Sequence, residues 1–171
     1  MTIAITDRTG TEFTPSADTT RALRDTLSRF ATGVTVVTCQ TPEGPMGITA
    51  NSFTSVSLDP ALVLWSVARN SSRFQAFADA SHFAIHILAE DERDLAARFT
   101  RGGDGFAGLD WTAGPGDAPR INGTFARFDC QQHATHDGGD HVIIVGRVLT
   151  AGYRDGSPLI FAQGHFGSFA R

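Results

Sequence analysis

Short apolar and β-branched segments separated by turn residues limit the fold of this chain more than any other feature. The segments 34–39 and 141–145 are rich in valine and isoleucine, and turn-forming residues stand at 41–45 and 137–139. Short strands joined by tight turns are typical of antiparallel sheets. Because the strands do not alternate strictly with helices, the pattern predicts a mainly β, antiparallel barrel with peripheral helices and not a doubly wound parallel sheet.

The same pattern gives approximate bounds for the elements. A helix is expected from Ser16 or Asp18 to about residue 31, because Leu23, Leu27 and Phe30 recur at helical spacing. Strands are expected at 34–39, 46–49, 56–58, 61–67, 82–88, 123–136, 141–153 and 159–161, and short helices at 71–77 and 90–99. Residues 1–17 are expected to form a flexible arm and 18–171 a single domain, in which the Gly/Pro-rich segment 100–119 is a loop and a candidate lid.

Composition and charge restrict the class of protein and its partners. Hydrophobic residues make up 41% of the 171 residues, and the charged fraction of 19% is low, so we expect a globular domain whose surface is partly covered by a partner. The net charge of −4 and the absence of a cationic cluster argue against nucleic-acid binding. No apolar run is long enough to cross a bilayer, and residues 1–13 are too polar for a signal peptide. We therefore expect a cytoplasmic protein without membrane contact.

Two motifs that could bind a metal or a nucleotide are set aside. Cys130, His133, His136 and His141 are zinc-type ligands, but alternation along a strand places Cys130 and His136 on one face and His133 on the other, so only a bulge would gather them. No metal is predicted, and Cys39 and Cys130 are interpreted as inert core thiols. Residues 103–108 match G-x-G-x-x-G, but they follow a helix and lead into 109–115, which cannot form the helix that this fingerprint requires.

Three polar segments are candidates for a binding site. Residues 49–53 place small residues, backbone amides and one amide side chain after a strand, where a flat heteroaromatic ring could approach closely; an ordinary Asn/Ser turn is the alternative. Residues 71–73 combine hydroxyls and a guanidinium at a helix start, which suits a phosphate or simply caps the helix. His141 follows a hairpin turn, either as a solvated turn residue or as a hydrogen-bond donor at the mouth of a pocket.

Several blocks resemble the flavin reductase component of two-component flavin-dependent monooxygenases. The blocks are RFATGVTVVT at 29–38, GITANSFTSVSLDP at 47–60, FAIHIL at 83–88, GDH at 139–141, GRV at 146–148 and PLIF at 158–161. They stand in the family's order and extend over about residues 18–169. The resemblance implies an FMN-binding split β-barrel, Greek-key-like and homodimeric, with the flavin in a groove near the subunit interface.

The resemblance also implies roles for individual residues. His141 would contact the nicotinamide of NADH and is the candidate catalytic residue. The residues expected to bind the cofactor are Gly33, Val34, Thr35, Thr49, Ala50, Asn51, Ser52, Phe53, Ser66, Val67, Ala68, Ser72, Arg73, His165 and Phe166.

Within that set, the segments would serve different parts of the ligands. Residues 49–53 would line the isoalloxazine with 33–35 alongside, and 66–68 with Ser72 would face the ribityl and phosphate end. Residues 164–166 read Gly-His-Phe where relatives often carry a Tyr in the last position, so the wall for the pyridine nucleotide would differ. Gly105 stands where many relatives have a Lys, so Arg101 or Arg73 would have to supply positive charge to a phosphate.

The implied reaction is hydride transfer from NADH or NADPH to FMN or FAD. Reduced flavin would then diffuse to a separate monooxygenase component, with no metal involved. Two other functions stay open on the same scaffold. One is a flavin-binding or flavin-carrying protein without catalysis, and the other is an oxidase that keeps its flavin tightly bound.

Overall fold

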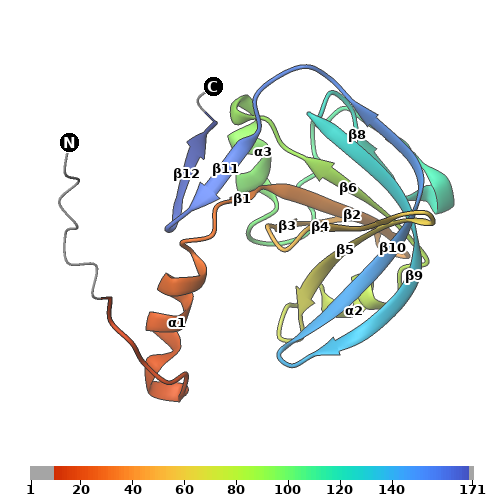
Figure 1. The fold of residues 1–171 in the computed structure, drawn as a ribbon. Coiled ribbons are helices and arrows are strands. Elements are labelled where there is room, and N and C mark those ends of the chain that lie inside the picture. Colours follow the sequence, from red (N-terminus) through yellow and green to blue (C-terminus); the bar gives the residue numbers. More distant parts are fainter. Residues whose placement is uncertain (1–9, 170–171) are drawn as a thin grey trace.

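The computed structural model describes residues 10–169, so residues 1–9 of the expected arm lie outside the described part. Most of the strands form one antiparallel sheet that curls into a barrel (Figure 1). These strands are β2 (Thr35–Thr41), β3 (Gly44–Ala50), β4 (Thr54–Leu58), β5 (Ala61–Ala68), β6 (His82–Ile87), β9 (Ala126–Gly138) and β10 (His141–Tyr153). Their order in the sheet is β3-β2-β6-β9-β10-β5-β4. The expected antiparallel, mainly β fold is confirmed.

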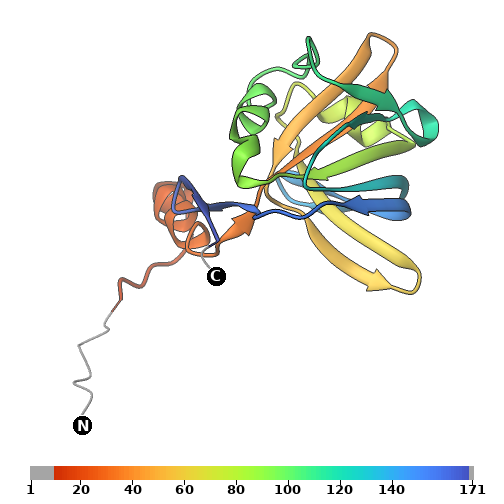
Figure 2. The same ribbon diagram turned by 90° about the horizontal axis from the view of Figure 1, so that it is seen from above.

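A smaller unit projects from one side of the barrel. It consists of a three-stranded sheet in the order β1-β11-β12, together with the helix that precedes it in the chain (Figure 2). Its elements are η1 (Ala17–Thr19), α1 (Thr20–Leu27), β1 (Thr32–Gly33), β11 (Leu159–Ala162) and β12 (His165–Ser168). The backbone N–H of Gln163 donates to the carbonyl of Ser28 at 2.8 Å, which ties the β11–β12 turn to the end of α1.

The remaining elements cover the barrel. They are α2 (Phe74–Asp79), η2 (Glu90–Glu92), α3 (Arg93–Arg98), β7 (Trp111–Ala113), η3 (Pro115–Asp117) and β8 (Pro119–Ile121). None of the described helices is long and apolar enough to cross a membrane.

Strand β2 is buried on both faces because it separates two hydrophobic cores. Val37 packs into a core with Trp65, Phe77 and Phe83, whereas the adjacent Val36 points into a second core. Side chains on a strand alternate between faces, so neighbouring valines reach different cores. Burying such a side chain stabilises the fold by about 1.5–3 kcal/mol relative to exposure. This accounts for the β-branched run at 35–38 in β2, which lacks the polar alternation of a half-exposed strand.

The segment 100–119 differs from the expected loop. It contains β7 and η3, and Phe106 is buried in the second core, where its ring meets Phe99 edge-on at 5.1 Å. A single phenylalanine among glycines gave no periodic signal, so the sequence pattern could not show that the segment packs. The helix expected to reach residue 31 ends at Leu27, and Phe30 beyond it is 79% exposed.

A bulge in β9 changes the placement of the zinc-type side chains for which no metal was predicted. Ala134 pairs with Val145 and Gln132 with Gly146, so His133 is the extra residue of a bulge. At this point a Cβ on Gly146 would lie 2.6 Å from Cζ of Phe83, which explains why only glycine fits. Even with the bulge, residues 10–169 hold no group of three or more His, Cys, Asp or Glu side chains placed to bind a metal ion.

Candidate functional site

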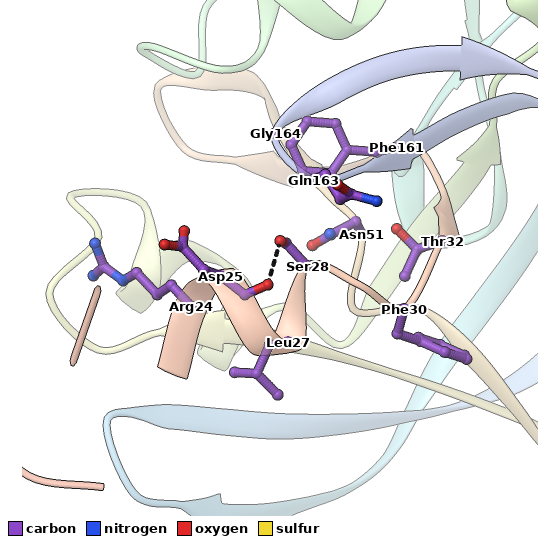
Figure 3. A pocket seen from close by; sticks show the side chains of 10 residues that line it. All are labelled: Arg24, Asp25, Leu27, Ser28, Phe30, Thr32, Asn51, Phe161, Gln163 and Gly164. Carbon is purple, nitrogen blue, oxygen red and sulfur yellow. Dashed lines mark hydrogen bonds between the residues drawn. The ribbon is translucent and has the colours of Figure 1, made fainter. Parts of the chain in front are cut away.

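Three cavities meet at Asn51, directly after the end of β3. The β5 cavity, about 280 Å³, lies between the 48–52 segment, β5 and the start of β10. The Phe166 cavity, about 210 Å³, lies between Val34, Thr49 and Phe166. The α1 cavity, about 420 Å³, lies between α1, β1 and the β11–β12 turn (Figure 3). Asn51 lines all three, so they adjoin one another at the junction of the barrel and the projecting unit, and together we call them the groove.

The β5 cavity gathers most of the residues expected to bind the cofactor. These residues come from segments that are far apart in the sequence. The pairing of β5 with β10 brings two of the segments together and places Ala68 opposite His141. The expected residues that line it are Thr49, Ala50, Asn51, Ser52, Ser66, Val67, Ala68, Arg73 and His141. Many of these side chains are small, so a flat ring can come close to the backbone of this wall.

Hydrogen bonds hold the backbone of this wall in place. The Ser52 hydroxyl donates to the carbonyl of Ser66 at 3.1 Å and accepts from its N–H at 2.9 Å. The Thr49 hydroxyl donates to the carbonyl of Ala96 at 2.6 Å. The hydroxyl of Thr35, which is 1% exposed, donates to the carbonyl of Ala50 at 2.7 Å. These hydroxyls therefore stabilise the wall, and Asn51 is left as an exposed amide at its edge.

His141 stands at the mouth of the β5 cavity with one ring nitrogen already paired. The two-residue turn at 139–140, with Gly139 at φ 75°, places Asp140 next to it. Nδ1 of His141 lies 2.7 Å from a carboxylate oxygen of Asp140, and because a carboxylate only accepts, Nδ1 carries the hydrogen. This hydrogen bond holds the pKa of Asp140 below its usual range. The other ring nitrogen, Nε2, has no hydrogen-bond partner among the described residues.

Arg73 acts as a clamp on backbone carbonyls. Its Nη1 donates to the carbonyls of Phe99 at 2.7 Å, Gly102 at 2.6 Å and Gly47 at 3.3 Å, and its Nη2 donates to Thr100 at 3.4 Å. The Nε of Arg73 is buried without a partner in the described part of the chain, and burial lowers the pKa of the guanidinium. The clamp thus fixes residues 99–102 against β3, on the side where Thr100 lines the Phe166 cavity.

Other residues of the expected set lie elsewhere. Val34 and Phe166 line the Phe166 cavity. Phe53 packs in the first core and stacks on Phe128 at 5.6 Å. The residues of the set that line none of these three cavities are Gly33, Thr35, Phe53, Ser72 and His165.

Several residues of the groove are not among those that the resemblance assigned to the cofactor. Ser71 lines the β5 cavity where Ser72 was expected, and its hydroxyl accepts from the N–H of Arg73 at 3.2 Å. A serine pair offered no signal for choosing between the two. Phe161 and Gln163 reach the groove from the C-terminal strands, a placement that follows only from the pairing of β1 with β11.

Comparison with known proteins identifies the family. The model of the flavin reductase like domain matches residues 27–170. The FMN reductase (NADH) SmoA of Agrobacterium fabrum is 57% identical over 159 residues, which cover 93% of this chain and 91% of that protein. The reductase component of the flavin-dependent trigonelline monooxygenase of Acinetobacter baylyi is 52% identical over 130 residues, covering 75% of this chain and 42% of that protein.

A solved structure agrees with the sequence matches. An NADH:FAD oxidoreductase of Streptomyces globisporus, in complex with NAD and FAD fragments, shares 37% identity and superposes with a TM-score of 0.84. The match covers 92% of this chain and 98% of that one. With the family model spanning most of the chain and close identity to its relatives, this chain belongs to the flavin reductase like domain family.

Proposed function

We propose that this chain is an NADH-dependent flavin reductase that reduces FMN or FAD and releases the reduced flavin to a separate monooxygenase component. The observation that carries the proposal is the β5 cavity, where the 49–52 segment, residues 66–68 and His141 meet on one groove. Relatives named as FMN reductase (NADH) and as reductase components of monooxygenases support the same reaction.

The residues of the groove fit a flavin. A flat isoalloxazine needs a wall without bulky side chains, and Ala50, Ser66 and Ala68 provide one. The exposed amide of Asn51 carries both a donor and an acceptor for the polar edge of the ring. Ser71 and the nearby backbone would face the ribityl and phosphate end. When bound, the flavin would supply N5 as the acceptor of the hydride that leaves C4 of the dihydronicotinamide with its electron pair.

The chain's own contribution is orientation. Small residues on the wall let two rings stack in near contact, and a groove closed on one side by the clamped 99–102 segment restricts how they slide. Nδ1 of His141 donates its hydrogen to Asp140, which fixes the ring, and Nε2 has no partner among the described residues and is available to a ligand. His141 would therefore position the nicotinamide, and no side chain has to transfer a proton in the hydride step.

A substitution of His141 tests this assignment. His141→Ala should lower kcat/KM for NADH by about tenfold to a hundredfold while flavin affinity changes little, because the imidazole serves the nicotinamide. His133→Ala is the matched control, since His133 is an exposed histidine of β9 that lines none of the three cavities. Steady-state kinetics with varied NADH measure both variants, and kinetics of His141→Ala equal to those of the control would remove His141 from the site.

The same proposal includes a homodimer and a cytoplasmic location. Helix α1 buries none of its residues against its own chain, and Leu27 and Leu58 are 64% and 95% exposed, as expected if a second copy covers them. The two cysteines are free and buried, which agrees with a reducing compartment that also supplies NADH.

A further inference from the structure

The turn that carries Asp140 lies beyond the end of the strand pairing. The pairing of β10 with β5 ends at His141 and Ala68, so the sheet fixes the backbone of His141 and leaves residues 139–140 outside it. The side chain of Asp140 is 93% exposed, and exposed turns move more than the strands they join unless other contacts hold them. Because Nδ1 of His141 donates to this carboxylate, the orientation of the imidazole depends on where the turn holds Asp140.

Arg69 holds this turn from the neighbouring strand, since it directly follows β5. Its backbone N–H donates to the carbonyl of Asp140 at 2.9 Å. In the side chain, Nε donates to the carbonyl of Gly139 at 3.0 Å and Nη2 pairs with a carboxylate oxygen of Asp137. Within residues 10–169, these are the only hydrogen bonds that reach 137–140 from outside the β9–β10 hairpin. One residue therefore contacts the turn with its backbone and with two nitrogens of its guanidinium.

The guanidinium of Arg69 is itself held in place by α2. It lies over the ring of Phe74 at 5.9 Å from the centroid, and Phe74 packs against the first core. A planar guanidinium can stack on a ring while its fork of N–H groups serves two acceptors. The side chains of Arg69 and Asp137 are 44% and 80% exposed, and an ion pair this exposed stabilises a fold little. The contacts of Arg69 thus do more for the position of the turn than for the stability of the barrel.

We propose that Arg69 is a positioning residue for His141 and acts through the 139–140 turn and the carboxylate of Asp140. The inference rests on the proposed function, in which the imidazole contacts the nicotinamide. Arg69 lines none of the three cavities, so its effect on a ligand passes through the turn. While the turn is held, Asp140 keeps the hydrogen on Nδ1, and Nε2 of the neutral ring is an acceptor for the ligand. A released turn would let the ring rotate and adopt the other tautomer.

The tautomer of His141 tests the proposal without any ligand. Arg69→Met removes both guanidinium contacts with the turn and keeps the backbone N–H, so the melting temperature should change little. At about pH 8, where a histidine is ordinarily neutral, nitrogen-15 NMR should find the hydrogen of His141 on Nδ1 in the wild type. The same spectrum of Arg69→Met should show a mixture of the two tautomers. His141→Ala identifies the signals of this residue by their loss.

Kinetics test whether the positioning matters for the reaction. Arg69→Met should lower kcat/KM for NADH by about threefold to tenfold, while the dissociation constant for FMN, measured by fluorescence quenching, stays constant. In the background of His141→Ala, the same substitution should change kcat/KM by less than about twofold. Two residues that act through one contact are not additive, whereas a general structural defect would lower kcat/KM equally in both backgrounds.

Arg154→Met is the matched control. Arg154 also joins a backbone carbonyl to a carboxylate, those of Gly123 and Asp91, and it lines none of the three cavities. It should leave the tautomer of His141 and the kinetics with NADH unchanged.

Three results for Arg69→Met would each overturn the inference and leave the proposed function intact. They are a single Nδ1–H tautomer of His141, an unchanged kcat/KM for NADH beside a defective His141→Ala, and an equal loss in both backgrounds. If the wild-type chain oxidises no NADH, the proposed function itself fails, and the tautomer still decides whether Arg69 positions the imidazole.

Discussion

His86 is a buried imidazole whose two nitrogens are both paired inside the barrel. It is fully buried, with Nδ1 3.0 Å from the carbonyl of Val36 and Nε2 accepting the backbone N–H of Ile121 at 3.0 Å. Only the neutral ring with its hydrogen on Nδ1 can make both bonds. Burial lowers the pKa of His86 to about 4. This residue joins β2, β6 and β8, and strand periodicity alone gave it no role beyond a place in β6.

The lowered pKa of His86 predicts acid sensitivity. The folded protein binds the proton less readily than the unfolded chain, whose histidines titrate near 6.5, so stability is complete above pH 6.5 and falls as the pH drops towards 4. The loss should approach about 3 kcal/mol over this window. Urea unfolding at a series of pH values measures it.

Two substitutions test whether His86 causes that loss of stability at acid pH. His86→Gln should be less stable at pH 7 but should flatten the pH dependence between 4 and 6.5, since no group at position 86 titrates there. His133→Gln, at an exposed site, should keep the full slope. A slope in His86→Gln as steep as in the wild type would show that another group causes the acid loss.

At the scale of elements, the hydrogen bonds from Arg73 to backbone carbonyls predict that loss of its guanidinium weakens the binding of flavins with and without a phosphate equally. Four carbonyls occupy its Nη atoms, so Arg73 shapes the wall at 99–102 and does not grip a phosphate. Arg73→Met should raise the dissociation constants of FMN and of riboflavin, which has no phosphate, by a similar factor of about ten. Fluorescence quenching by both ligands measures this.

Arg154→Met provides the control for the clamp. Arg154 also donates to a backbone carbonyl, that of Gly123 at 2.7 Å, and it pairs with Asp91 and Glu92 away from the groove. The Arg154→Met variant should be less stable than the wild-type protein but should bind flavin with the same affinity. A defect of Arg73→Met confined to FMN would mean that the guanidinium releases the carbonyls and binds the phosphate, as the sequence had suggested.

The sequence predicts those elements that are encoded by local patterns, and it does not predict contacts between distant segments. The β-branched run of β2, the turn at 41–45 and the GDH hairpin identified the strands and the wall of the β5 cavity, because turns and alternation act over a few residues. The burial of Phe106 and the position of Gln163 depend on contacts between distant segments, which no local pattern encodes. The carbonyl partners of Arg73 likewise appear only when residues 99–102 fold back on β3.

At the scale of the whole molecule, the exposed apolar side chains predict self-association. Leu58 and Tyr153 on the barrel and Phe30 after α1 are 95%, 89% and 79% exposed. Light scattering on the purified chain should give about twice the 18.2 kDa of one chain. Leu58→Asp should weaken the dimer, because burying a leucine contributes about 1.5–3 kcal/mol and a carboxylate reverses that gain. A mass of one chain at micromolar concentration would refute the dimer.

Flavin-dependent oxidation of NADH tests the central claim most directly. The purified chain is mixed with NADH in air, with FMN, FAD or no flavin added, and the loss of NADH absorbance is followed. A flavin reductase with a diffusible product should show turnover that rises with added flavin, saturates, and is nearly absent without it. Flavin binding seen by fluorescence quenching, together with no NADH oxidation at any flavin concentration, would contradict the account and indicate a flavin carrier.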